Sequence, residues 1–203
     1  MKVAVSFLSS DYEMDKTIEL IDNSIADYIH VDVMDGLFVN NKNFSPLDLL
    51  VLLGKTNKLL DVHLMVNNPI PYINAIKDLK NLDAITIHSE IDSYYECAKL
   101  IKDLGIKLGV ALNPSTVVRD MQDKIELADL VLVMSVVPGA GGQKFIEDVI
   151  YKIAMIKAMN KLVYIDGGIN DETIKLVKGV DCVISGSYVC KSLDYNERIN
   201  KLK

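Results

Sequence analysis

Residues 28–42 read YIHVDVMDGLFVNNK and form the most informative stretch of this 203-residue chain. The stretch begins as an apolar run with His30 and Asp32 at two-residue spacing, which places both side chains on one face of a β-strand. The strand is otherwise built for burial, where an unpaired charge is costly. Asp35-Gly36, a turn dipeptide, ends the run. We therefore expect the pair to lie near the carboxyl end of the strand and to meet a metal, a substrate or each other.

Two further apolar runs carry similar polar residues. Residues 59–65 read LLDVHLM and place Asp61 and His63 on one face, while residues 161–168 read KLVYIDGG and deliver Asp166 directly before two glycines. Asp61 sits deeper in its strand, and we interpret it as a supporting group. Two imidazoles and two carboxylates suit zinc, iron(II), manganese(II) or cobalt(II) better than magnesium or calcium. The sequence thus predicts one divalent metal with the ligands His30, Asp32, His63 and Asp166.

Size and composition fit one domain over residues 1–203. Half the residues are apolar and 25% are charged, which is typical of soluble globular proteins. The net charge of -6 argues against a nucleic acid or an anionic membrane as partner. It does not exclude a phosphate held by backbone amides.

Cysteine usage and the amino terminus bear on the compartment. The cysteines are odd in number and show no CxxC spacing, which is typical of a reducing compartment: Cys97, Cys182 and Cys190. No basic segment precedes an apolar stretch at the start, and no apolar run approaches ~20 residues. We expect a soluble, unprocessed, cytoplasmic protein.

Short apolar runs alternate with longer amphipathic segments along the whole chain. Strands are predicted over residues 3–7, 27–33, 59–64, 84–88, 107–112, 130–134, 162–166 and 182–184. Helices are predicted between them, for example over residues 13–23, 69–79, 93–104, 144–159 and 171–177. Eight near-continuous apolar strands with helices between them indicate an α/β fold, a closed (β/α)8 TIM barrel. An open doubly wound sheet is the alternative. In a barrel, the polar residues above would meet at the carboxyl ends of the strands.

Three glycine turns follow the last three strands and predict a phosphate site. In the first, three glycines within four residues allow backbone N–H groups to converge on an anion, and the following helix is expected to add its dipole. Phosphate sites in such barrels commonly use the turns after strands seven and eight. The alternative is that tight connections simply need glycine. The turns contain Gly139, Ala140, Gly141, Gly142, Gly167, Gly168, Gly186 and Ser187.

Other notable residues have simpler interpretations. His88 is interpreted as a satisfied core histidine, and Lys144 as the solvated start of a helix. Three methionines recur at strand ends, where core filling is the default and a soft lining around a reactive carbon is the alternative: Met34, Met65 and Met134.

The motifs HVDVMDGLFV, LDVHLMV, LVLVMSVVPGAGGQKF, and DGGIN followed by SGS resemble those of the ribulose-phosphate 3-epimerase family. Their order and spacing cover essentially the whole chain. The resemblance implies an isomerase that interconverts D-ribulose 5-phosphate and D-xylulose 5-phosphate in the pentose phosphate pathway. It implies that Asp32 and Asp166 act as the two acid/base groups and also bind the metal with His30 and His63. It also implies that substrate contacts come from Ser6, His63, Gly139, Ala140, Gly141, Gly142, Asp166, Gly167, Gly168, Gly186 and Ser187.

Three departures from the family pattern leave the proposed catalytic groups in place, and the second and third concern the rim of the pocket. Val5 replaces a proline, Ala140 replaces an aromatic residue, and Lys42 lies in an altered segment after the MDG motif. A related hexulose-phosphate 3-epimerase acting on D-allulose 6-phosphate is therefore an alternative. A decarboxylase of this barrel type would need a lysine where the chain has His63, and a phosphate-binding barrel without activity would not need the metal set. Self-association as a homo-oligomer is also expected.

Overall fold

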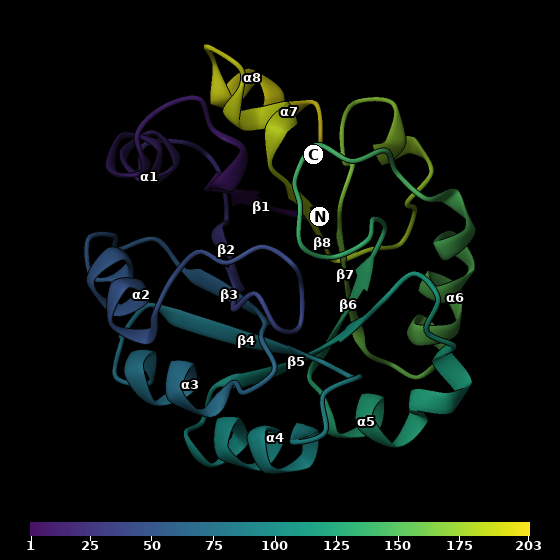
Figure 1. The fold of residues 1–203 in the computed structure, drawn as a ribbon. Coiled ribbons are helices and arrows are strands. Elements are labelled where there is room, and N and C mark those ends of the chain that lie inside the picture. The colour runs from purple at the N-terminus through teal and green to yellow at the C-terminus, as the bar shows by residue number, and fades with distance from the viewer.

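In the computed structural model, which describes residues 1–203, eight parallel strands close into a barrel in chain order (Figure 1). Strand β8 pairs with β1, so the sheet has no free edge. The predicted (β/α)8 barrel is confirmed. The strands are β1 (Lys2–Ser6), β2 (Tyr28–Met34), β3 (Leu60–Met65), β4 (Leu82–His88), β5 (Lys107–Leu112), β6 (Leu130–Met134), β7 (Leu162–Asp166) and β8 (Cys182–Ser185).

Helices surround the barrel; α7 lies beside β1 and η1, and α8 packs against α7 at the edge of the molecule (Figure 1). The α-helices are α1 (Met14–Asp22), α2 (Pro46–Leu53), α3 (Ile70–Ile76), α4 (Tyr94–Asp103), α5 (Gln122–Leu127), α6 (Ile150–Ala158), α7 (Ser187–Cys190) and α8 (Tyr195–Asn200). Four short 3-10 helices join them: η1 (Phe7–Ser9), η2 (Val118–Met121), η3 (Glu147–Val149) and η4 (Thr173–Lys175). The predicted helices over residues 13–23, 69–79 and 93–104 correspond to α1, α3 and α4. No helix is long and apolar enough to cross a membrane.

The helix predicted over residues 144–159 begins later than expected. Residues 143–146 form no helix: Ile146 has extended backbone angles, its N–H donates to the carbonyl oxygen of Ser135 at 2.8 Å, and Phe145 is buried. Helical structure starts only at η3 and continues as α6. The glycine loop therefore does not open directly into a helix. The prediction that a helix dipole acts at that loop was wrong.

The helix predicted over residues 171–177 was also wrong, because only the 3-10 turn η4 forms there. None of the three residues of η4 is buried. A short helix depends on packing an apolar face, so this segment has too little to hold further turns. Gly179, with a φ of 87°, then turns the chain toward β8.

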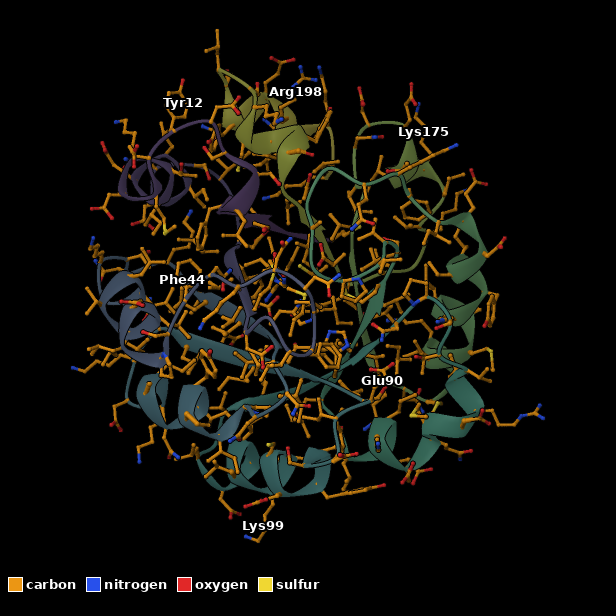
Figure 2. The ribbon with its side chains drawn as sticks, viewed as in Figure 1. Tyr12, Phe44, Glu90, Lys99, Lys175 and Arg198 are labelled. Atoms are coloured by element: carbon orange, nitrogen blue, oxygen red, sulfur yellow. The ribbon has the colours of Figure 1, made fainter.

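Apolar side chains form two layers on either side of the strands. The larger layer lies between strands and helices, as a parallel sheet covered on its outer face requires. The smaller layer fills the inside of the barrel, where Tyr28 and Tyr164 are its largest side chains. Charged side chains such as Lys99 and Arg198 lie at the periphery instead (Figure 2).

Inward-facing positions recur every second residue, so His30 and Asp32 follow Tyr28 on the inner face of β2. Strand register then sets their level in the barrel. Ser6, the last residue of β1, pairs with His30, which is only the third residue of the seven in β2. The expectation that His30 lies at the carboxyl end of its strand was therefore wrong. The stagger of the strands in a closed barrel brings it level with Ser6.

Candidate active site

Four side chains from three strands converge inside the barrel. One ligand atom from each lies within 4.8 Å of those from the other three, in the set His30, Asp32, His63 and Asp166. Register places Asp32 opposite His63 across β2 and β3, while β7 brings Asp166 from beyond β8 and β1. The structure thus brings together the four residues that the sequence singled out as metal ligands.

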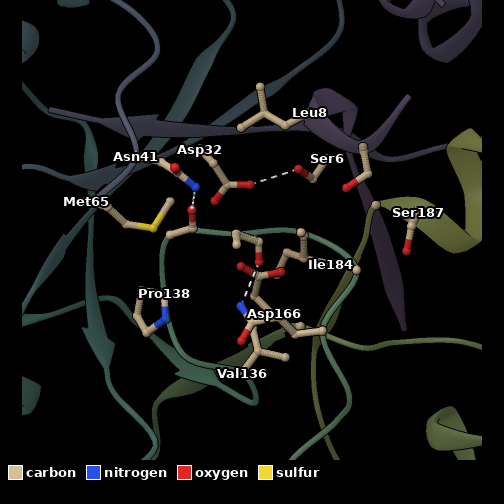
Figure 3. Close-up of a pocket in the computed structure, with 18 of the residues that line it drawn as sticks. Ser6, Leu8, Asp32, Asn41, Met65, Val136, Pro138, Asp166, Ile184 and Ser187 are labelled. Atoms are coloured by element: carbon tan, nitrogen blue, oxygen red, sulfur yellow. Dashed lines mark hydrogen bonds between the residues drawn. The ribbon is translucent and has the colours of Figure 1, made fainter. Parts of the chain in front are cut away.

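The two carboxylate oxygens of Asp32 face different partners. Oδ1 lies 3.3 Å from His30 Nε2 and 3.1 Å from His63 Nδ1. Oδ2 accepts a hydrogen bond from the Ser6 hydroxyl at 2.8 Å (Figure 3). One oxygen therefore faces the histidines and the other faces Ser6.

Asp61 supports His30 from below the cluster. Its Oδ2 lies 2.8 Å from His30 Nδ1, and both side chains are buried. Because the carboxylate accepts the proton on Nδ1, His30 presents Nε2 toward Asp32 and Asp166. This arrangement agrees with the interpretation of Asp61 as a supporting group, and Asp61 lies outside the four-residue set.

The two aspartates of the cluster have opposite pKa shifts. Burial, reinforced by the nearby charge of Asp32, raises the pKa of Asp166 to about 7. Burial also acts against ionisation of Asp32, but the charge of His30 and hydrogen bonds from His30 and His63 outweigh it and hold the Asp32 pKa far below its usual range. Near neutral pH the site therefore holds one ionised carboxylate beside a carboxyl group that can carry a proton.

A cavity of about 320 Å³ lies over the cluster. Asp32 and Asp166 line it, whereas His30 and His63 lie fully buried beneath it. The predicted glycine turns all reach its wall, in the set Gly139, Ala140, Gly141, Gly142, Gly167, Gly168, Gly186 and Ser187. Ser6 and the sulfur-bearing side chains of Met34, Met65 and Met134 complete much of the lining. Figure 3 shows Asp32 beside Ser6, and Asp166 close to Val136 and Ile184.

Known proteins match this chain over almost all of its length. Residues 2–190 match the model of the ribulose-phosphate 3 epimerase family. A ribulose-phosphate 3-epimerase of Helicobacter pylori is 41% identical over 213 residues, covering 100% of this chain and 97% of the relative. One from Bacillus subtilis is 38% identical, covering 100% and 98%. The chain belongs to the ribulose-phosphate 3-epimerase family. It is therefore an isomerase.

A solved structure with low sequence identity has the same fold. A mutant tryptophan synthase alpha-subunit of Pyrococcus furiosus superposes with a TM-score of 0.72 at 15% identity, covering 100% of this chain and 96% of that one. At this identity the likeness concerns the barrel alone.

The donor set of this epimerase-family site fits a divalent metal. Two imidazole nitrogens and two carboxylate oxygens are typical ligands of zinc, iron(II), manganese(II) and cobalt(II). Two carboxyl groups also face one another in a buried place, where the charge of Asp32 helps to raise the pKa of Asp166. A cation between them would relieve that repulsion.

A loop from β2 lies against the glycine loop at the rim. The Asn41 side-chain amide donates to the Gly139 carbonyl oxygen at 2.6 Å (Figure 3). A Cβ on Gly139, whose φ is 111°, would lie 2.9 Å from Cβ of Val39, so the close approach requires glycine. Two of the departures from the family pattern, Lys42 and Ala140, also line the cavity.

Sequence reasoning missed Asn43 and assigned His88 only to the core. The Asn43 side chain accepts from the N–H of Met34 and donates to the carbonyl oxygen of Asp32, which ties the end of β2 to its loop. His88 is buried, with Nε2 2.9 Å from His63 Nε2 and Nδ1 3.3 Å from Glu90. The signal was the two-residue spacing of His88 and Glu90, the same spacing as in His30 and Asp32. Lys144 is exposed, as expected, but precedes η3 rather than starting a helix.

Proposed function

We propose that this protein interconverts D-ribulose 5-phosphate and D-xylulose 5-phosphate by moving the proton at C3. One observation carries the proposal. Two aspartates with opposite pKa shifts lie together beneath a cavity whose far wall is made of glycine turns. Epimerisation beside a ketone needs a base to take the carbon-bound proton and an acid to return one to the opposite face.

Asp32 and Asp166 are the proposed acid/base pair. Asp32, ionised, would take the proton at Oδ2, the oxygen that Ser6 holds. Asp166, which carries a proton near neutral pH, would donate to the other face of the carbon. The two groups come from β2 and β7, with β8 and β1 between them, so they approach the substrate from different directions. The roles exchange in the reverse reaction.

The proposed metal is held by His30 Nε2, His63 Nδ1 and one oxygen from each aspartate. When bound, a divalent cation supplies Lewis-acid stabilisation of the negative charge that develops on the substrate oxygens. The histidines lie beneath the cavity and contribute no proton. Their other ring nitrogens are already engaged by Asp61 and His88. The identity of the metal is left open among zinc, iron(II), manganese(II) and cobalt(II).

The phosphate group is proposed to bind at the glycine turns. Gly167 and Gly168 have φ values of 116° and 65°, and a Cβ on Gly168 would lie 2.7 Å from the Phe145 nitrogen. The absence of side chains leaves backbone N–H groups open to an anion. Binding energy at this end would position C3 over the aspartates, so the phosphate should matter for turnover as well as for affinity.

The test is proton NMR of ribulose 5-phosphate incubated with the protein in D2O. The proposal expects deuterium to enter at C3 as xylulose 5-phosphate forms, and free ribulose to react very slowly. Exchange at C1 instead of C3, or equal rates with free ribulose, would contradict it.

A second candidate substrate is D-allulose 6-phosphate. Ala140 lines the cavity where the family pattern has an aromatic residue, and a smaller side chain leaves room for a longer carbon chain. Comparing kcat/KM for the two sugar phosphates decides between them. A clear preference for the hexulose would change the substrate and keep the proton-transfer scheme. Self-association and a cytoplasmic location remain predictions.

A further inference from the structure

A chain of hydrogen bonds leads away from the site through His88, which the proposed reaction does not use. His63 Nε2 lies 2.9 Å from His88 Nε2, and His88 Nδ1 lies 3.3 Å from Glu90 Oε2. The two rings meet at their Nε2 edges, with centroids 5.0 Å apart and planes inclined by 30°. His63 and His88 are fully buried, and Glu90 follows the end of β4, where Figure 2 labels it.

The outer end of this chain fixes the direction of its hydrogen bonds. Glu90 Oε1 accepts from the backbone N–H of Asn113 at 3.3 Å and from the hydroxyl of Thr116. An ionised carboxylate has only acceptors, so Oε2 accepts a proton from His88 Nδ1. In neutral His88 the other nitrogen, Nε2, then carries a lone pair. That lone pair accepts from His63 Nε2, which therefore carries a proton. The other nitrogen of His63, Nδ1, lies 3.1 Å from Asp32 Oδ1, and a metal binding at Nδ1 would displace any proton that it donates to this carboxylate.

The neighbours of Glu90 are themselves held in place. Lys152 is fully buried in α6, and its ammonium donates to the carbonyl oxygens of Asn113 at 2.7 Å and Pro114 at 2.9 Å. The loop after β5 therefore presents its donors to Glu90 in a fixed position. On the other side Phe38 covers the His88 ring, with centroids 4.5 Å apart.

We propose that Glu90 and His88 are positioning residues that set the tautomer of His63, so that Nδ1 offers a lone pair to the metal. This inference rests on the proposed function, in which His63 is a ligand. Asp61 does the same for His30 with a single carboxylate. For His63 the orienting carboxylate is that of Glu90, and the His88 ring lies between them. Such outer partners of metal-binding histidines commonly contribute about 10–100-fold to metal affinity or activity.

The variant Glu90→Gln separates this role from simple packing. The two donors at Oε1 would hold the amide oxygen there, so the amide nitrogen would face His88. His88 would then carry its proton on Nε2 and donate to His63 Nε2, which moves the His63 proton to Nδ1. The side chain keeps its size while the chain of hydrogen bonds reverses.

The first measurement is long-range proton–nitrogen NMR of the histidines in metal-free protein. We expect neutral His88 with its proton on Nδ1 in the wild type and on Nε2 in Glu90→Gln. Wild-type His88 with its proton on Nε2 would overturn the proposal, as would an unchanged tautomer in the variant. This experiment needs neither the metal nor the substrate.

The second measurement is the affinity of the folded, metal-free variants for Mn(II). Glu90→Gln and His88→Phe should each bind about 10–100-fold more weakly than wild type. Phe38→Leu should bind like the wild type, because it alters the packing of His88 without removing a hydrogen bond. Unchanged affinity in both site variants would overturn the proposal while leaving the metal centre intact. A wild type that binds no Mn(II) and no zinc, iron(II) or cobalt(II) would instead refute the metal centre.

Discussion

Mn(II) binding to the metal-free protein should weaken at least about tenfold when the pH falls from about 8 to about 6. Metal ligands must be deprotonated, so protons compete with the metal at every ligand whose pKa is raised. Burial and the charge of Asp32 raise the pKa of Asp166 to about 7. A group with that pKa is about nine-tenths ionised at about pH 8 and about one-tenth ionised at about pH 6, which gives the factor of about ten.

His30 should add to this effect in the same direction. Burial opposes its protonation, but the charges of Asp32 and Asp61 outweigh burial and raise the pKa of His30 above its usual value. As the pH falls, a second proton therefore competes for the site. The loss of affinity should exceed the factor that Asp166 alone produces, and binding should release more than one proton at about pH 6.

The assay is a titration followed by the electron paramagnetic resonance signal of free Mn(II), with proton release measured in weakly buffered solution. Asp78→Asn is a matched control, because Asp78 is an exposed carboxylate outside the site. It should keep the full pH dependence. Equal affinity at the two pH values, or binding without proton release at about pH 6, would refute the assignment of these residues as ligands.

Three further predictions concern catalysis and the phosphate end. Asp32→Asn and Asp166→Asn should each lower kcat by about 10²–10⁴-fold; Asp166→Asn with full metal and near-normal turnover would contradict the two-base scheme. Gly168→Ala should lower the free energy of unfolding, measured with urea, by about 1–3 kcal/mol and should raise KM, because a Cβ there would lie 2.7 Å from the Phe145 nitrogen. Gly105→Ala is the control: Gly105 also has a positive φ but lies in open space, so KM should not change. Chelation should abolish epimerisation with the barrel still folded by circular dichroism, and several divalent ions should restore it to different degrees; full activity in metal-free protein would end the metal hypothesis.

The barrel could be predicted because its strands are buried on both faces. Near-continuous apolar runs marked the strands over residues 107–112, 130–134 and 162–166 with the bounds that the structure has. Helix bounds were less predictable because they depend on packing. The non-helical chain through Phe145 and Ile146 is held by a hydrogen bond to Ser135, a partner that the local pattern does not reveal.

The site was predictable in its members but not in its connections. Two-residue spacing marked His30 with Asp32 and Asp61 with His63, and the barrel brought Asp166 to them. Spacing could not show that His88 contacts His63, because His63 pairs in register with Thr86, two residues earlier in β4. The contact depends on the tilt of the strands and on the length of two imidazole side chains. The level of His30 depended on strand stagger in the same way.

His30 is oriented by a carboxylate, Asp61, whereas His63 is oriented by an imidazole, His88, and this difference affects the total charge of the site. Asp32, Asp61 and Asp166 already place three carboxyl groups inside the barrel, against which a divalent cation supplies two charges. A carboxylate in the place of His88 would add a fourth carboxyl group, and its negative charge would raise the pKa of Asp166 further. The neutral imidazole of His88 instead transmits to His63 the hydrogen-bond direction that Glu90 sets. The side chain of Glu90 is 28% exposed, whereas that of Asp61, which orients His30, is only 2% exposed. The negative charge that orients His63 is thereby kept near solvent, and Asp166 keeps a pKa at which it can exchange a proton near neutral pH.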